Sequence, residues 1–338
     1  MRCTRYNHLA TKEKTVSRIV LFLLLLFVGP AERDATAQPA AKKVRLGIQS
    51  NNIGFLPFHL AYHKGYYREQ GIDLETIFMA TQAVNAAFVR GDIDYSAAIN
   101  GVIQTIVRGN SARILAVAID RPLISLIARK EIRTAQELRG KKIGGSTPGG
   151  TATLMADTAL KHLGLQAGRD VTIVPLRENR LAALDSAAVD AALLGVPENI
   201  LAVDRGYNEL LFVGDIVNFP QNAIGVATRR IQENPDEVYG MVRAALRALY
   251  FALEPRNRDE VISIVMKQWK LSDRRIASEM LRQFNRGMAR DLMAKPEGMQ
   301  LMIDLVREDS KVTQPFSLAQ VVDYTFVERA RRDLGSSR

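Results

Sequence analysis

The chain has 338 residues, of which 47% are hydrophobic and 24% are charged, and its formal net charge is +10. These proportions are typical of a globular protein of about two domains, and they exclude a disordered chain, a polytopic membrane protein and a fibrous repeat. The only cysteine is Cys3. Because it precedes every segment with a folding pattern, we expect no disulfide, cysteine-ligated metal or cysteine nucleophile in the folded part.

The first 37 residues have the three parts of a secretory signal peptide. Basic residues up to Arg18 precede eleven uncharged residues, 19–29. Eleven residues of helix rise about 16 Å, too little to cross a hydrocarbon core of about 30 Å. Ala35-Thr36-Ala37 then provides a small-x-small cleavage site. We therefore expect cleavage after Ala37 and a mature chain in the bacterial periplasm, with an uncleaved anchor as the alternative.

Removal of this segment also changes the charge. Six bases and three acids leave with it, so the mature chain carries 40 bases, 33 acids and a net charge of +7. The remaining bases are spread along the chain beside acids and are not interleaved with aromatic residues. This pattern gives no support for a nucleic-acid partner.

The mature chain alternates short apolar runs with segments of helical periodicity. Strands are predicted at 44–49, 73–78, 94–99, 113–119, 123–128, 141–144, 171–174, 191–194, 210–213 and 222–228. Helices are predicted at 57–64, 82–90, 134–139 and 151–163, and then at about 236–253, 258–269, 273–289, 297–308 and 317–333. Strands that alternate with helices over short connections indicate an α/β protein with mostly parallel sheets covered by helices.

One short pattern occurs twice. In residues 91–100 and again in 188–196, an acid (Asp94 or Asp190) begins an apolar strand and a loop opens about six residues later. The repetition suggests two lobes of similar topology, with the strands at 123–128 and 222–228 as the crossings between them. A ligand crevice is then expected outside the carboxyl ends of the strands, facing the other lobe.

Four segments carry a resemblance to a known family. Residues 60–75 contain Ala61, Gly65-Tyr66-Tyr67, Gly71 and Asp73 at the spacing found in bacterial ABC-transporter substrate-binding proteins of the nitrate/sulfonate/taurine type. These proteins are related to the thiamine-pyrimidine-precursor binders. The segments 89–94, 137–143 and 189–192 are similar to three further motifs of that family, in the same order. The resemblance covers roughly residues 44–230.

The resemblance implies a fold and a function. The fold is the type II periplasmic binding protein fold, two α/β lobes joined by two crossing strands, with a helical C-terminal region. Lobe one is expected to contain residues 42–128 plus 224–338, and lobe two residues 129–223. The function is that of the solute-binding component of an ABC importer, a monomer that binds a small polar or anionic organic solute and delivers it to an ABC permease in the inner membrane.

Two other functions stay open. One is an enzyme of the pyrimidine-precursor type on the same fold, although the mature chain has no cysteine for the iron motif of such enzymes and no recognised catalytic motif. The other is a ligand-sensing partner of a membrane sensor. We expect a binding protein without enzymatic activity and without a cofactor.

The candidate ligand-binding residues lie where the strands end. Residues 144–151 are rich in glycine and hydroxyl groups and lead into a helix, whose unpaired N–H groups suit a carboxylate or sulfonate. Any single residue of these loops could instead serve only the turn it stands in. The candidates are Asn51, Asn52 and Phe55 after the first strand, Asn100 after the third, Ser146, Thr147, Gly149, Gly150 and Thr151 in the glycine-rich loop, and Pro197, Glu198 and Asn218 in lobe two.

His59 and His63 have the i,i+4 spacing with which one helix face can chelate a metal. No cysteine, HExxH motif or carboxylate at a matching offset supplies a third ligand. We therefore expect no metal site.

Export of the chain can be tested directly. Expression in a Gram-negative host should yield a soluble periplasmic protein that begins at Gln38, because signal peptidase cleaves after a small-x-small motif. Intact-mass spectrometry of the periplasmic fraction measures the N-terminus. Retention of residue 1, or persistent membrane association of a chain without lipid, would contradict the prediction.

Overall fold

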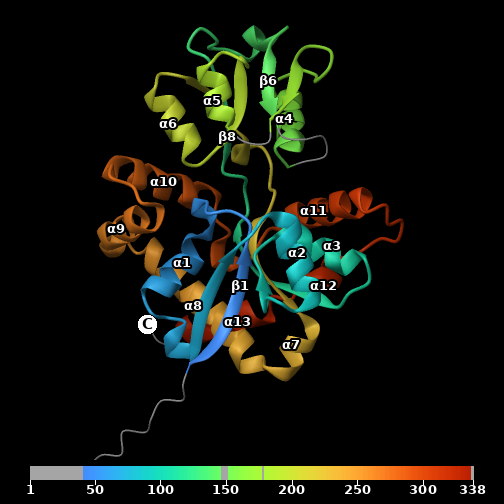
Figure 1. Cartoon of the computed structure of the whole chain (residues 1–338), viewed down its shortest axis with the longest axis vertical. Helices are drawn as coiled ribbons and strands as arrows, with labels where there is room; N and C mark the ends of the chain where they lie inside the picture. The colour runs from blue at the N-terminus through green and yellow to red at the C-terminus, as the bar shows by residue number, and fades with distance from the viewer. Residues whose placement is uncertain (1–40, 146–150, 177–178, 336–338) are drawn as a thin grey trace, which may run out of the picture. The chain divides into compact units, whose positions relative to one another are not determined.

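Two five-stranded mixed sheets form the framework of the computed structural model, which describes residues 41–145, 151–176 and 179–335 (Figure 1). Sheet A has the order β2–β1–β3–β10–β4, with β1 Lys42–Ile48, β2 Ile72–Phe78, β3 Tyr95–Ser96, β4 Ala112–Ile119 and β10 Gln221–Ala227. Sheet B has the order β7–β6–β8–β5–β9, with β5 Ile124–Ala128, β6 Lys142–Gly145, β7 Thr172–Pro175, β8 Ala191–Gly195 and β9 Asn208–Phe212.

The two sheets share one topology, in agreement with the repeated sequence pattern. In each sheet three neighbouring strands are parallel, and the fourth strand (β10 or β5) is antiparallel to both of its neighbours. Four of the five strands in each sheet therefore run in the same direction, and each sheet is mixed, with two parallel and two antiparallel pairings. The fourth strand is the one that follows a crossing. Because the crossing leaves one sheet at the carboxyl edge and enters the other at its carboxyl edge, that strand must run in the opposite direction.

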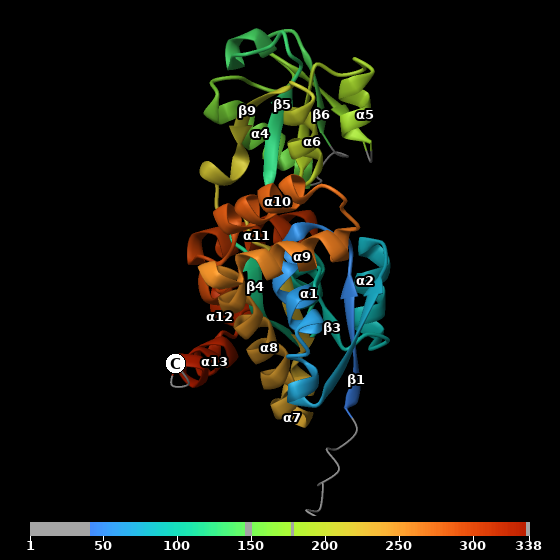
Figure 2. The ribbon, with the colours of Figure 1, turned by 90° about the vertical axis from the view of Figure 1, so that its left-hand side faces the viewer.

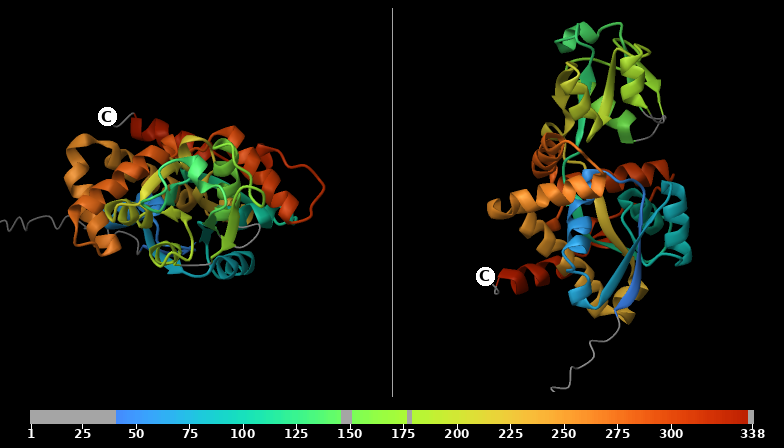
Figure 3. Two further views of the ribbon diagram at one scale, coloured as in Figure 1. Left: turned by 90° about the horizontal axis from the view of Figure 1, so that it is seen from above. Right: turned by 60° about the vertical axis from the view of Figure 1, so that its left-hand side comes forward.

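Helices cover both faces of sheet A. Figure 3 (right) shows α1 and α8 on one face and α2 and α3 on the other, and Figure 2 shows α1 and α8 from the front. The helices are α1 Leu56–His63, α2 Thr81–Arg90, α3 Ile99–Val107, α4 Thr151–His162, α5 Arg180–Asp185, α6 Glu198–Asp204, α7 Thr228–Glu233, α8 Pro235–Leu253, α9 Arg258–Trp269, α10 Arg274–Gly287, α11 Pro296–Asp309, α12 Leu318–Val321 and α13 Thr325–Gly335.

Most predicted elements are confirmed within two residues, and the largest error is at residues 94–99. The predicted strand is only the two-residue β3, and Ile99 begins helix α3. The buried apolar residues of α3 have helical spacing: Ile99, Val102, Ile103 and Ile106. The sequence therefore contained a helical pattern here, but a short one. The short helices α5, α6 and α7 were also missed, the segment 134–139 contains a 3₁₀ turn (Ala135–Leu138), and the predicted helix 317–333 is divided into α12 and α13.

The repeated acids have the same structural task in both sheets. The Asp94 carboxylate accepts a hydrogen bond of 2.7 Å from the backbone N–H of Arg45, and the Asp190 carboxylate accepts one of 2.9 Å from the backbone N–H of Lys142. Each acid stands just before the third strand of its sheet and pairs an N–H of the neighbouring second strand, at the middle of β1 (Arg45) and at the first residue of β6 (Lys142). Asp94 also pairs with Arg230 at 2.5 Å, which joins β3 to α7.

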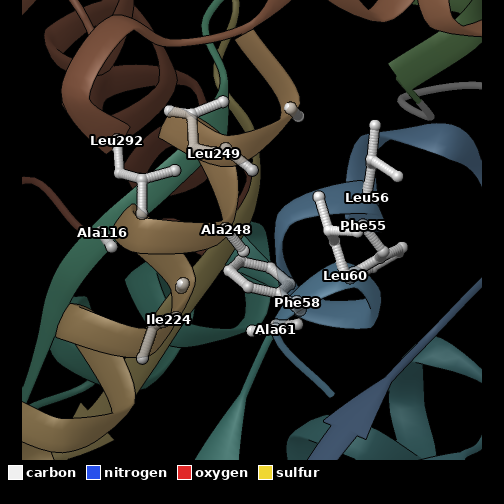
Figure 4. Close-up of a cluster of buried hydrophobic side chains, with 14 of the residues drawn as sticks. Phe55, Leu56, Phe58, Leu60, Ala61, Ala116, Ile224, Ala248, Leu249 and Leu292 are labelled. Carbon is white, nitrogen blue, oxygen red and sulfur yellow. The ribbon is translucent and has the colours of Figure 1, made fainter. Parts of the chain in front are cut away.

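The main core lies between sheet A and helices α1 and α8. Figure 4 shows Phe55, Phe58 and Leu60 opposite Ala248 of α8, and all four side chains are buried. Burial of one such large side chain contributes about 1.5–3 kcal/mol. This packing holds the start of α1, and with it the loop that follows β1, in one position.

The two crossings and the C-terminal helices meet around Asp120. Its backbone N–H donates to the carbonyl oxygen of Gly287 at 2.9 Å, its carbonyl oxygen accepts from the N–H of Phe219 at 2.9 Å, and its carboxylate accepts from the N–H of Lys295 at 2.9 Å. Asp120 follows β4 in the first crossing and Phe219 precedes β10 in the second. The end of α10 and the start of α11 are therefore bonded to both crossings.

The histidines of α1 serve packing. His59 is 9% exposed, and its ring stands edge-on to that of Trp269 at a centroid distance of 5.5 Å. His63 Nε2 lies 2.9 Å from Gln268 Oε1. Burial, and then the charge of neighbouring His63, lowers the pKa of His59 to about 4. Within the residues that the structure describes, no group of three or more His, Cys, Asp or Glu side chains is placed to hold a metal ion.

Substitution of Gly287 tests the junction at Asp120. A Cβ at this position would lie 2.7 Å from the carbonyl oxygen of Arg121 and 2.3 Å from Leu123 Cδ2. We expect Gly287→Ala to lower the free energy of unfolding by about 1–3 kcal/mol through overpacking, measured by urea denaturation. Gly335→Ala, where a Cβ would meet nothing within 4 Å, is the control. Equal free energies of unfolding of the two variants would show that contact of a Cβ at position 287 with Arg121 and Leu123 does not destabilise the fold.

The low pKa of His59 predicts an acid-sensitive fold. His59 is neutral in the folded chain below the pH at which an unfolded histidine takes up a proton, so stability falls as the pH drops from about 6.5 towards 4. The loss attributable to this one group is about 3 kcal/mol. Denaturation across this pH range should show a weaker dependence in His59→Asn, with exposed His162→Gln as the control. If stability depended on pH as steeply in His59→Asn as in the wild type, the acid sensitivity could not come from a buried, neutral His59.

Candidate functional site

A cavity of about 330 Å³ lies where three strands of sheet A end. Gln49 directly follows β1, Thr81 begins α2 after β2, and Asn100 stands in the first turn of α3 after β3. The second crossing closes the cavity with Phe219 and the first residues of β10. The lining residues are Gln49, Asn52, Thr81, Ala98, Ile99, Asn100, Ile124, Phe219, Pro220, Gln221, Asn222 and Met302.

A second cavity of about 270 Å³ adjoins the first. The two share Thr81, Asn100, Phe219 and Met302. The second cavity extends between α2, α3 and α11, whose proximity Figure 1 shows, and its further walls include Asn85 and the apolar side chains of Leu305 and Val306. We refer to the two cavities together as the carboxamide chamber.

The chamber is lined by uncharged polar groups. Gln49, Asn52, Gln221 and Asn222 line the first cavity, Gln82, Asn85 and Gln104 line the second, and Asn100 lines both. The only ionisable side chain among the described lining residues is Asp309, at the outer end of α11. A solute in this part of the site would therefore meet hydrogen-bonding groups, without a cation to balance a negative charge.

Three carboxamide oxygens of the chamber are buried without a hydrogen-bond partner among the described residues. They are Gln49 Oε1, Asn85 Oδ1 and Asn100 Oδ1. A buried acceptor left unpaired costs about 1–3 kcal/mol. All three oxygens are enclosed by the protein, and Asn85 Oδ1 lies against α3, where a Cβ on Gly101 would come within 1.6 Å of it.

The N-terminal ends of two helices add backbone N–H donors to the chamber. Helices α2 and α3 begin at the chamber, and their N-cap residues, Ala80 and Ala98, have no side chain that could accept from the first N–H groups. The first turn of any helix leaves its N–H groups without intrahelical partners. The chamber thus offers both hydrogen-bond donors, from the helix ends, and acceptors, from the carboxamides.

Two of the residues selected from sequence line the chamber, Asn52 and Asn100. The Asn52 side-chain oxygen accepts from the N–H of Gly54 at 2.8 Å, and its nitrogen donates to Ser50 Oγ at 2.7 Å. Asn52 is therefore fixed by its own turn. Asn100 stands in the first turn of α3 and not, as expected, at the end of a strand.

Three other candidates are placed away from the chamber lining. Phe55 is 0% exposed and packs against Phe58 and His59, so in this structure it is a core residue and cannot stack on a solute. Asn51 is exposed, and its carbonyl oxygen accepts from Trp269 Nε1 at 2.5 Å. Asn218 donates to Glu297 Oε1 at 3.2 Å.

The remaining candidates belong to the sheet B side. Pro197 follows a cis peptide bond, and Glu198 begins α6. Thr151 begins α4, directly after the glycine-rich loop, which itself follows β6 as residues 49–52 follow β1. Ser146, Thr147, Gly149 and Gly150 lie outside the described residues.

The structure adds chamber residues that were not selected from sequence. The chief ones are Gln49, Thr81, Phe219, Asn222 and Met302. Asn222 is 2% exposed and adopts φ 55°, and its oxygen lies where a Cβ on Gly54 would come within 2.4 Å. Gln49 adjoins the Ser50-Asn51-Asn52 run, so its position after a strand was a usable signal. No local sequence pattern identifies Met302, which lies in α11 of the C-terminal region.

A further cavity, of about 830 Å³, lies between α6, β9, α9 and α10. It is lined by arginines and acids that pair with one another, as Arg275 does with Asp204 at 2.5 Å and Arg282 with Glu279 at 2.5 Å. Beside it, Asn199 of α6 donates to Gln283 Oε1 of α10 at 2.8 Å. These contacts join α10 to elements that pack on sheet B, and the charges of the cavity are already compensated.

No helix among the residues that the structure describes is long and apolar enough to cross a membrane.

Solved structures share the fold. The putative periplasmic sulfonate-binding protein SsuA of an ABC transporter of Methylobacillus flagellatus KT aligns with a TM-score of 0.70 at 19% identity, over 88% of this chain and 96% of that one. The periplasmic nitrate-binding protein NrtA of Synechocystis PCC 6803 aligns with a TM-score of 0.65 at 18% identity, over 86% and 89%. These matches confirm the expected fold of two α/β lobes with a helical C-terminal region. The desulfurization enzyme DSZB also aligns, with a TM-score of 0.64 at 16% identity over 88% of this chain and all of that one, so the fold also supports catalysis.

Sequence comparison gives the family. The riboflavin-binding protein RibY of Chloroflexus aurantiacus is 28% identical over 243 residues, which are 68% of each chain. The model of the family described as NMT1/THI5 like matches residues 52–257, a range that begins in the loop after β1 and contains both crossings and all five strands of sheet B. The chain belongs to the NMT1/THI5-like family.

Proposed function

We propose that the protein is the solute-binding component of an ABC importer, exported to the periplasm, which delivers a small polar solute to a permease in the inner membrane. The observation that carries the proposal is the carboxamide chamber, a polar cavity at the carboxyl ends of the strands of sheet A, in a chain of this family. Ligands of open α/β sheets bind at that edge. Its polar groups are arranged to bind and orient a solute, and the fold is shared with binding proteins of ABC transporters.

The proposed binding uses both lobes. Lobe one, residues 42–128 plus 224–338, would contribute most of the chamber, with Asn52 and Asn100, and the second crossing would add Phe219, Gln221 and Asn222. Lobe two, residues 129–223, would contribute the loop with Ser146, Thr147, Gly149, Gly150 and Thr151, together with Pro197 and Glu198. A solute that contacts both lobes shifts the equilibrium between the open and closed conformations toward the closed one. The permease would bind that closed conformation.

A substitution of Asn100 tests the binding site. Loss of its carboxamide should weaken binding about tenfold or more, because one buried hydrogen bond is lost and its partner is left unpaired. The measurement is calorimetric titration of the mature chain and of Asn100→Ala with riboflavin, uracil, taurine, ethanesulfonate and nitrate. A solute at 100 times its Kd should also stabilise the protein by about 2.7 kcal/mol.

The matched control is Asn110→Ala, which removes an exposed carboxamide beyond the other end of α3 and should leave the affinity unchanged. Equal affinity of Asn100→Ala and wild type for a bound solute would place the site elsewhere. The recovered solute should be chemically unchanged after prolonged incubation. Turnover would favour the alternative represented by DSZB, an enzyme on this fold.

A further inference from the structure

Helix α10 has an apolar side and a polar side. The apolar side is buried in the main core through Ala277, Met280, Leu281 and Phe284. The polar side carries residues three or four positions apart, which therefore lie on one face of the helix: Arg275, Glu279, Arg282, Gln283 and Arg286. Three of them bond to residues of α6 and of the segment after β9. Helix α10 thus connects the two lobes without belonging to either crossing (Figure 2).

The first of these links is an ion pair between accessible groups. Two guanidinium nitrogens of Arg275 donate to the two carboxylate oxygens of Asp204, at the end of α6, at 2.8 and 2.5 Å. A bidentate pair of this kind fixes orientation as well as distance. The two side chains are 60% and 32% exposed, so water can take the place of the contact when α6 moves away.

The second link is a buried pair of carboxamides. Asn199 Nδ2 of α6 donates to Gln283 Oε1 at 2.8 Å, and both side chains are buried. Asn199 Nδ2 also donates to Ser125 Oγ of β5 at 3.1 Å. Gln283 Nε2 also donates to Glu279 Oε1 at 3.4 Å. Each carboxamide therefore keeps a partner on its own side of the interface when α6 separates from α10.

The third link lies at the other end of α10, beside the junction at Asp120. The Arg286 guanidinium stacks on the ring of Phe212 at 3.9 Å, and its Nε donates to Asp215 Oδ1 at 3.2 Å. Arg275 is twelve residues from Gly287, about 18 Å along the helix. A lobe rotation of about 10° across the helix axis at the junction displaces α6 from Arg275 by about 3 Å, enough to break a hydrogen bond.

The cavity of about 830 Å³ beside these links has walls of opposite charge. The wall formed by α9 and α10 carries four bases and two acids: Arg258, Asp259, Arg274, Arg275, Glu279 and Arg282. The charged residues of the opposite wall are the acids Asp204 and Glu209. The two walls therefore attract each other, and the cavity admits water to the polar groups when they separate.

We propose that the polar side of α10 is a latch, which holds the two lobes in the orientation of this structure in the absence of solute and is released when the lobes rotate. Val196, Ile200 and Phe212 also reach the main core, so the interface is mixed, and partly polar interfaces between domains of one chain permit relative motion. The inference goes beyond the proposed function, because it concerns the chain without solute. For a solute that requires another orientation of the lobes, only the released fraction of the chains is competent to bind, so the latch sets the apparent affinity.

Pulsed electron paramagnetic resonance on the mature chain, without solute, tests the latch. The mature chain has no cysteine, so Val89→Cys in α2 and Lys161→Cys in α4, both exposed, are its only labelling sites. The distance between the two spin labels reports the orientation of the lobes, and the wild type should give one narrow distribution. Arg275→Gln and Asp204→Asn should each increase the population outside it about threefold or more, the scale of an accessible ion pair.

The matched control is Arg274→Gln. Arg274 adjoins Arg275 and lines the same cavity, but it pairs with Asp259 of α9 at 2.6 Å, on its own side of the interface. Its substitution should leave the distance distribution unchanged. Equal effects of Arg274→Gln and Arg275→Gln would overturn the latch, because the charge of α10 and not the link to α6 would then be responsible.

Reversal of the pair separates the contact from its individual charges. Arg275→Asp should broaden the distribution, and Arg275→Asp combined with Asp204→Arg should narrow it again. Gln283→Ala should broaden it, because Asn199 loses its bond across the interface. The melting temperature of each variant reports folding. A wild-type distribution as broad as that of the variants, or no restoration in the folded reversed pair, would overturn the latch and leave the proposed function, which the solute titrations test, untouched.

Discussion

The hydrogen bonds around Asp120 are the constraint on which the rest of the arrangement depends. One residue of the first crossing bonds through its main chain to the end of α10 and to the second crossing, and through its carboxylate to the start of α11. Gly287 permits this approach because any Cβ would collide with backbone at Arg121. Both connections between the sheets therefore pass through one small, bonded junction, and a change of angle between the lobes must occur at the residues beside it.

The junction at Asp120 also accounts for the position of the carboxamide chamber in the fold. Since each crossing joins carboxyl edge to carboxyl edge, the loops that follow β1, β2 and β3 all open at the end of sheet A from which the crossings leave. Asp94 and Asp190 occupy equivalent places in the two sheets, and each accepts a hydrogen bond from a backbone N–H of the neighbouring strand, β1 or β6. The regular part of the fold is thus repeated, and the chemistry is left to loops and helix ends at one edge.

The chamber shows why fold similarity gives little information about ligand chemistry. The aligned binding proteins are below 20% identical to this chain, so side chains at the edge of the sheet are free to differ while the strands keep their order. Here those side chains are carboxamides with buried, unpaired oxygens.

The sequence by itself determined the strand and helix alternation, the repeated acid pattern and the family, because each depends on local periodicity or on short motifs. It also placed Asn52 and Asn100 near a strand end. Only the tertiary structure decided that β3 stops after two residues and α3 begins at Ile99, that Phe55 belongs to the core, and that Asn222 and Met302 join Gln49 at one cavity. These residues are up to about 250 positions apart. Packing between distant segments brings them together, and local sequence propensity does not report such packing.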